Sequence, residues 1–143
     1  MTIQDKMNQI ENDFKQLSDW EKKYERIIQI GKTWSGLSDD FKTEDLKIKG
    51  CQSQVWIKSD LKDGRLHFLG DSDALLVKGL VALVITVYSG ESPEAILATE
   101  PTFLKNIGLD SGLSPSRANG LYSMIKQIKY YATAYQYLLN QKK

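Results

Sequence analysis

The fold of this chain is decided by residues 55–90, which read VWIKSDLKDGRLHFLGDSDALLVKGLVALVITVYSG. Residues 55–57 are β-branched or aromatic and favour extended structure. Asp63-Gly64 is a strong signal for a tight hairpin turn, and the apolar residues within 66–69 suit a return strand. The stretch therefore begins with a predicted antiparallel hairpin.

The second half of the same stretch predicts a buried helix. Asp71, Ser72 and Asp73 open it, and it runs to Ser89 before Gly90 stops it. Its residues are apolar nearly all round, so we expect this helix to form the centre of the domain.

Amphipathic helices are predicted on the N-terminal side. An apolar stripe with spacings of four and three runs from Ile3 to Leu17. Ser18 and Glu21 have capping-box spacing, which predicts a second helix that ends near Gly31.

Further helices are predicted on the C-terminal side. The pairs Ser92-Pro93 and Ser114-Pro115 each combine a cap residue with proline at the first helical position. A short helix is expected at residues 101–107, and a long last helix ends in a frayed Lys142 and Lys143. The architecture predicted from these residues is α+β, with helices on one side of a small antiparallel sheet.

Length and composition limit the classes of protein that fit. The chain has 143 residues and a formal net charge of +1, which predicts a single domain over residues 1–143. The balanced charge argues against a nucleic-acid binder that relies on bulk charge. One Cys and one His exclude a disulfide framework and a Cys/His zinc site, so no metal is expected.

No membrane or targeting segment is expected. The apolar run from Leu80 to Tyr88 is far shorter than the roughly 20 residues of a membrane-spanning helix. The N-terminal residues mix both charges and lack the apolar region of a secretory signal. These features predict a cytoplasmic protein with a reduced thiol and no membrane partner.

Cys51 is the residue best suited to chemistry. It follows Gly50, which frees the backbone to bend, and it precedes the small or amide side chains Gln52, Ser53 and Gln54. Without a second cysteine, this thiol can accept and donate one sulfur atom but cannot form an internal disulfide. The alternative is a buried cysteine that serves only as a small hydrophobic residue.

The hairpin register predicts what lies near this cysteine. A two-residue turn at Asp63-Gly64 pairs His67 with Asp60, roughly 30 Å from Cys51, which argues against His67 as its base. The same register brings residues 71–73 to the end of the sheet that carries the Cys51 loop.

Two sets of charges are then expected to act on Cys51. Lys47 and Lys49 would lower its pKa. Asp71 and Asp73 would raise the pKa and keep the resting thiol unreactive, or would serve only as caps of the following helix. The shielding interpretation predicts that the loop moves out when a partner docks.

Arg117 lies in the first turn of the last helix, where the helix dipole disfavours a cation. Its rigid donor fork suits three roles: it pins the Cys51 loop, pairs with Asp71 or Asp73, or contacts a partner protein. The alternative is an exposed arginine without a role.

Together, four segments resemble the SufE family of sulfur-acceptor proteins. They are FKTEDLKIKG at 41–50, GCQSQVW at 50–56, GDSDALLVKGL at 70–80 and LSPSRANGL at 113–121. The resemblance extends from about Trp20 to Ile128.

This resemblance implies a fold and a function. The fold would be helices on a three-stranded antiparallel sheet, similar to IscU-like iron–sulfur scaffold proteins. Cys51 would take persulfide sulfur from a PLP-dependent cysteine desulfurase, activate that enzyme, and pass the sulfur to iron–sulfur cluster assembly. The residues expected to support the Cys51 loop are Gly50, Gln52, Ser53, Gln54, Asp71, Ser72, Asp73 and Arg117.

The resemblance also implies partners. The desulfurase would be SufS-like or CsdA-like, the downstream scaffold SufBCD-like, and the PLP would belong to the desulfurase, so no cofactor is expected on this chain. Three other functions remain open: sulfur trafficking with a second, CsdA-like desulfurase, a thiol peroxidase or hydrolase, and a non-catalytic interaction module in which Cys51 is incidental.

Overall fold

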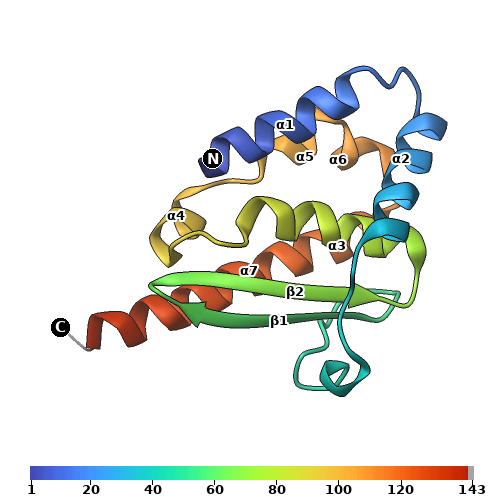
Figure 1. Ribbon diagram of the computed structural model, residues 1–143. Coiled ribbons are helices and arrows are strands. Elements are labelled where there is room, and N and C mark those ends of the chain that lie inside the picture. Colours follow the sequence, from blue (N-terminus) through green and yellow to red (C-terminus); the bar gives the residue numbers. More distant parts are fainter. Residues whose placement is uncertain (142–143) are drawn as a thin grey trace.

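The predicted hairpin and apolar helix form the centre of the computed structural model, which describes residues 1–141 (Figure 1). The expected fraying of Lys142 and Lys143 lies outside the described residues. The elements, in chain order, are α1 (Ile3–Lys15), α2 (Trp20–Thr33), the 3-10 helix η1 (Asp39–Phe41), β1 (Val55–Lys62), β2 (Arg65–Ser72), α3 (Leu75–Tyr88), α4 (Pro93–Ala98), α5 (Thr102–Asn106), α6 (Leu109–Gly112) and α7 (Pro115–Gln141).

Helix α3 is the central element, as its composition predicts. Ten of its 14 residues are buried, and it contacts α1, α2, α7 and both strands. Figure 1 shows it between α1 and the hairpin, with α7 also packed against this layer. The centre of the core therefore comes from one continuous apolar segment of the sequence.

The hairpin has the predicted register. Asp60 pairs with His67 and Ile57 with Gly70, and both turn residues of Asp63-Gly64 have positive φ, as a tight two-residue hairpin requires. Along β2 the side chains alternate between exposed and buried up to Gly70. This alternation places the helices on one face of the hairpin and solvent on the other.

The sheet has two strands within the described residues, so the expectation of three strands is wrong. The chain before Cys51 does run beside β1, but it forms only one bridge, Lys47 with Trp56. Turns at residues 44–46 and 49–50 flank that bridge. The extended stretch between the turns is too short for a ladder.

The helix starts are partly as predicted. Ser92 caps α4 and Pro93 takes its first position. The N-cap of α2 is Asp19 rather than Ser18, because the Asp19 carboxylate accepts the N–H of Lys22. The short α6 was not expected; its N-cap is Gly108, whose φ of +86° ends α5 and starts a new helix in a conformation that glycine adopts readily.

Candidate functional site

Cys51 lies in the loop before β1 and packs on α7. The loop turns at Gly50, which has φ +89°, and a Cβ at that position would lie 2.8 Å from the Ser123 Oγ. The positive φ favours glycine there, and a larger residue would also have to displace the Ser123 hydroxyl. The Cys51 Sγ lies 3.5 Å from the carbonyl oxygen of Gly120 and donates a weak hydrogen bond to it.

Burial governs the acidity of this thiol. Cys51 is half-buried, and loss of solvent raises the pKa of the thiol above its ordinary value. The prediction that Lys47 and Lys49 lower the pKa is wrong, since neither contributes and Lys47 pairs with Glu44 at 3.8 Å. Asp71 and Asp73 do not contribute either, so the prediction that these acids raise the pKa of Cys51 is also wrong, and desolvation is the cause of the raised value.

A small cavity of about 50 Å³ opens beside the thiol. Its apolar wall comes from Val77 and Leu80 on α3 and from Met124 on α7, all buried. The full lining consists of Cys51, Gln52, Ser53, Val77, Leu80, Ser116, Arg117, Gly120 and Met124. A water-sized group needs roughly 10–15 Å³ of such space, so one further atom bonded to Sγ fits.

Residues 72 and 73 hold the far end of the Cys51 loop at Gln54. The Asp73 Oδ1 accepts the Gln54 N–H at 3.0 Å. The Asp73 N–H and the Ser72 Oγ both donate to the Gln54 carbonyl, at 3.2 and 2.8 Å. The predicted meeting of the two segments at one end of the sheet is confirmed.

Neither Asp71 nor Asp73 caps α3, so the capping interpretation is wrong. The N-cap is Ala74, which makes no side-chain cap bond, and the side chain that binds its own N–H is Ser72, whose Oγ accepts at 3.2 Å. Asp71 is instead a buried residue within β2, 5% exposed. Burial alone would raise the pKa of its carboxyl, but hydrogen bonds and lysine charges outweigh burial and lower it.

Arg117 is exposed on the first turn of α7 and lines the cavity beside Cys51. Within residues 1–141 its side chain forms no hydrogen bond or ion pair, so the predicted pairing with Asp71 or Asp73 is wrong. It does not pin the loop by a hydrogen bond either. Contact with a partner protein stays a prediction.

The structure adds residues that sequence reasoning did not place at the site. Gly120 lies directly against the thiol, since a Cβ there would make an ordinary contact of 3.4 Å with the Cys51 Sγ. A glycine inside a helical pattern signals a close contact, but the pattern does not identify the neighbour. No sequence pattern indicated that Ser123 and Met124 lie beside Cys51.

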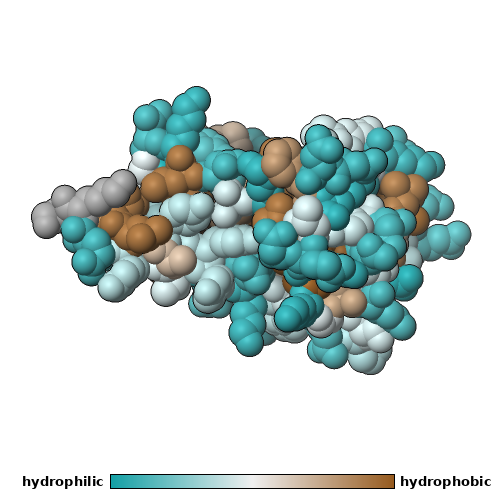
Figure 2. Space-filling view, turned by 90° about the horizontal axis from the view of Figure 1, so that it is seen from below, coloured by the Kyte–Doolittle hydropathy of each residue, from teal (hydrophilic) through white to brown (hydrophobic). Residues whose placement is uncertain are grey.

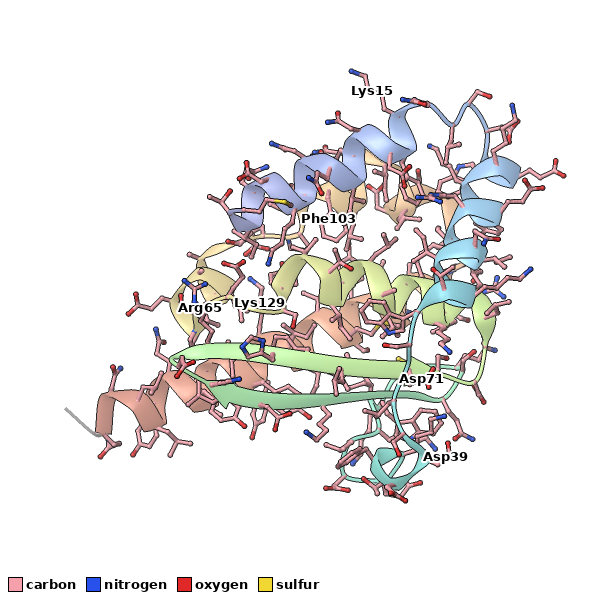
Figure 3. All side chains as sticks on the ribbon, viewed as in Figure 1. Lys15, Asp39, Arg65, Asp71, Phe103 and Lys129 are labelled. Carbon is pink, nitrogen blue, oxygen red and sulfur yellow. The ribbon has the colours of Figure 1, made fainter. Side chains whose placement is uncertain are left out.

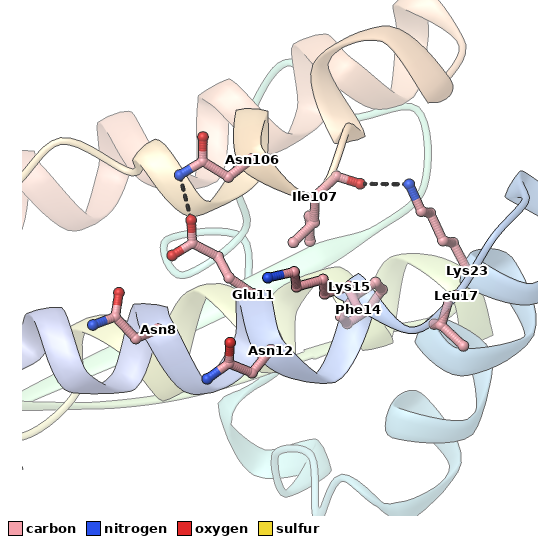
Figure 4. Close-up of a pocket in the computed structure, with 9 residues that line it drawn as sticks. All are labelled: Asn8, Glu11, Asn12, Phe14, Lys15, Leu17, Lys23, Asn106 and Ile107. Atoms are coloured by element: carbon pink, nitrogen blue, oxygen red, sulfur yellow. Dashed lines mark hydrogen bonds between the residues drawn. The ribbon is translucent and has the colours of Figure 1, made fainter.

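A wider groove of about 670 Å³ lies elsewhere, between α1, the start of α2 and the end of α5 (Figure 4). Some of its polar groups already bond to each other: Asn106 donates to Glu11, and the Lys23 Nζ donates to the Ile107 carbonyl at 3.1 Å. It contains none of the Cys51 loop residues, so it is separate from the candidate site.

Comparison with known proteins identifies the family. The model of the Fe-S metabolism associated domain named SufE matches residues 8–132. The chain belongs to the SufE family. The resemblance carried by the Cys51, GDSD and SPSR segments is thereby confirmed.

Relatives within the SufE family cover most of the chain. An uncharacterized SufE-like protein of Synechocystis is 40% identical over 135 residues, which span 94% of this chain and 85% of that protein. A SufE-like protein of Rhizobium etli is 41% identical, with 86% of each chain covered. The chloroplastic/mitochondrial SufE-like protein 1 of Arabidopsis thaliana is 38% identical over 85% of this chain and 33% of its own length.

A solved structure has the same fold. The solution structure of a hypothetical protein from Thermus thermophilus matches with a TM-score of 0.73 at 23% identity, covering 90% of this chain and 94% of that one. Among residues 1–141, no helix combines the length and apolar character needed to cross a membrane. The cytoplasmic location stays a prediction.

Proposed function

We propose that this SufE-family chain accepts one sulfur atom on Cys51 from the persulfide of a PLP-dependent cysteine desulfurase. The observation that carries the proposal is the position of Cys51, the one cysteine of the chain, in a loop beside a cavity with room for a second sulfur atom. An accessory role in sulfur transfer is consistent with the family.

The transfer is a thiol exchange without net oxidation. The Cys51 thiol loses its proton to solvent, and the thiolate attacks the outer sulfur of the partner persulfide. The sulfur–sulfur bond of the partner breaks, and its cysteine leaves as a thiolate that takes up a proton. Cys51 then carries the outer sulfur until the next thiol or a scaffold accepts it.

The closed loop suits storage rather than attack. Burial raises the pKa of Cys51 and keeps it a thiol at neutral pH. The Cys51 Sγ makes one weak hydrogen bond of 3.5 Å to Gly120, so separation from α7 breaks no strong hydrogen bond at the thiol. We infer that docking draws the loop outward, which hydrates the thiol, and that the loaded persulfide returns to the apolar cavity.

The partners follow from the same chemistry. The desulfurase, SufS-like or CsdA-like, supplies both the PLP and the persulfide. A SufBCD-like scaffold for iron–sulfur clusters takes the sulfur, and removal of sulfur from the desulfurase accelerates its turnover. Arg117 is exposed beside Cys51 and available to contact the desulfurase.

Intact mass spectrometry tests the proposal. The chain is incubated with an active desulfurase, PLP and cysteine without reductant. Wild type and a control variant at an exposed hairpin site, Asp60→Ala, should gain the mass of one sulfur atom. Cys51→Ser should gain none, and peptide mapping should place the sulfur on Cys51. If a desulfurase that binds the chain adds no sulfur to wild type, Cys51 is not the acceptor and the interaction-module interpretation gains support.

The surface of the protein bears on the alternative of a non-catalytic interaction module. Figure 2 shows the face seen from below Figure 1 as mainly hydrophilic, with hydrophobic residues scattered over it and gathered near the end of α7, where Leu138 is 52% exposed. No observation on this face favours a module that binds through a broad apolar patch.

A further inference from the structure

Asp71 is a buried carboxylate that sulfur chemistry at Cys51 does not use directly. Its Oδ2 accepts the Leu37 N–H at 3.1 Å and lies 3.3 Å from the Lys42 Nζ. Its Oδ1 accepts the Ser72 N–H at 2.8 Å and lies 3.5 Å from the Lys78 Nζ. Both oxygens are thus satisfied, and two of the four partners belong to the segment after α2.

The backbone of that segment is shaped to fit the carboxylate. Gly36 has φ +75°, and a Cβ there would lie 2.6 Å from the Asp71 Oδ2. Just before it, the Trp34 indole N–H donates to the carbonyl of Gly70 at 3.0 Å. Figure 3 shows Asp71 at the end of the hairpin, above the part of the chain that carries Asp39.

Lys42 fixes the end of the same stretch. Its Nζ also contacts Asp39 at 3.1 Å and lies 5.6 Å from the centre of the Trp56 ring. The ammonium therefore joins η1, β1 and β2. These contacts hold residues 34–42 against the hairpin.

Three consecutive residues at the end of β2 and just after it hold both ends of the segment that carries Cys51. Asp71 holds Leu37 and Lys42 at its start, whereas Ser72 and Asp73 hold Gln54 at its end. Residues 43–53 lie between the two attachments. Within this stretch the Ile48 N–H donates to the Val55 carbonyl at 2.7 Å, and the Ile57 N–H donates to the Leu46 carbonyl at 3.1 Å. The released thiol therefore moves on residues 49–53, and the Asp71 contacts brace the stretch that leads into this pairing with β1.

We propose that Asp71 is a positioning residue for sulfur acceptance, because it braces the stretch that leads to residues 46–48 and so helps to fix the point from which the released Cys51 loop extends. This inference rests on the proposed function of Cys51. A fixed attachment point for the loop keeps the thiol close to the position that a docked persulfide requires. Without the anchor, the thiol samples a larger volume, and productive encounters become rarer.

The chain offers variants that separate anchoring from general stability. Asp71→Asn weakens all four contacts, and Lys42→Gln removes the ammonium that belongs to the segment. Lys78→Gln is the matched control, since Lys78 contacts the same carboxylate but belongs to α3 rather than to the segment.

Hydrogen exchange and alkylation of the free protein are the first measurements. Asp71→Asn and Lys42→Gln should speed exchange of residues 36–50 and alkylation of Cys51 by about tenfold, the effect of one lost charged hydrogen bond. Exchange in α1 and α4 should stay at the wild-type level, and Lys78→Gln should resemble wild type throughout. Unchanged exchange in residues 36–50, or equal acceleration in α1, would overturn the anchor.

A single-turnover assay with excess persulfide-loaded desulfurase then tests the effect on transfer. The saturated rate of sulfur arrival on Cys51 should fall in both segment variants, with the half-saturating concentration and the final amount of sulfur unchanged. A lower final amount at a wild-type rate would mean only a smaller folded fraction and would refute positioning. If wild type accepts no sulfur, the proposed function fails, while the exchange data still decide whether Asp71 anchors the segment.

Discussion

The Asp73 carboxylate accepts the backbone N–H of Gln54 at 3.0 Å, and the Asp73 N–H donates to the Gln54 carbonyl at 3.2 Å. This pair continues the register of the hairpin by one step beyond Val55 and Ser72. Cys51 therefore lies only three residues beyond the last position at which the hairpin holds the chain.

Loss of the Asp73 side chain should loosen the Cys51 loop. Asp73→Ala removes the bond from Oδ1 and leaves the backbone bond to Gln54, so the fold should persist while the loop opens more often. A charged hydrogen bond of this kind predicts alkylation of Cys51 by iodoacetamide about tenfold faster than in wild type. Asp60→Ala, at an exposed site on the same hairpin, should leave the rate unchanged. Equal rates in the two variants would show that Asp73 does not restrain the loop.

The thiol should titrate above the ordinary range of cysteine. Burial raises the pKa of Cys51, so the alkylation rate of the native chain should reach half its maximum above the roughly 8.5 of a free cysteine. The same chain in urea should show the ordinary value. A native midpoint at or below the urea midpoint would contradict the buried, neutral thiol.

The raised pKa also predicts how stability depends on pH. A group whose pKa is higher in the folded state stabilises that state below its unfolded pKa, and this contribution is lost as pH rises through the folded pKa. Wild type should therefore lose free energy of unfolding above roughly pH 8.5, and Cys51→Ser should lose less. Urea titrations at neutral and alkaline pH measure the difference.

The sequence was most informative where the structure is local. The turn at Asp63-Gly64 determines the whole hairpin register, and the apolar run that became α3 can only be buried. A third strand was expected but did not form, because turns on both sides of Lys47 limit the pairing of this segment with β1 to one bridge. No local pattern shows how long a pairing continues.

The candidate site was predictable in its chemistry but not in its contacts. Cys51 and its proximity to the GDSD segment follow from one motif and one register. The partners of Asp71, by contrast, lie at Leu37 and Lys42, more than 25 positions away in the chain. A capping role is the natural expectation for an acid that precedes a helix. In the structure, residues distant in the sequence bind the Asp71 carboxylate instead.

Gly120 gives a direct test of the cavity beside Cys51. A Cβ there would lie 3.4 Å from the Cys51 Sγ, so Gly120→Leu should fill the cavity and push the thiol outward. We expect faster alkylation and a shorter lifetime of the Cys51 persulfide against added thiol. Gly120→Ala is the milder control: it makes an ordinary contact and should stabilise α7 by roughly 0.5–1 kcal/mol. A persulfide in Gly120→Leu as durable as in wild type would show that the cavity does not shelter it.

Asp71 should also make the fold sensitive to acid. Although burial opposes ionisation, the Leu37 and Ser72 N–H groups and the charges of Lys42 and Lys78 lower the pKa of Asp71. A depressed pKa means that this carboxylate stabilises the folded state above its unfolded pKa of roughly 3.9. That contribution is lost as pH falls through the lower, folded value.

The change Asp71→Asn should therefore reduce stability at pH 7 and weaken its decline below roughly pH 4. Urea unfolding at a series of pH values measures both effects. Asp63→Asn is the control, because Asp63 is exposed at the hairpin turn and asparagine tolerates its φ of +55°. If Asp71→Asn and wild type lose stability in parallel as the pH falls, the Asp71 carboxylate carries none of the acid sensitivity. The ion pairs to Lys42 and Lys78 would then contribute no net stability, and the Leu37 N–H bond alone would have to hold the start of the Cys51 segment.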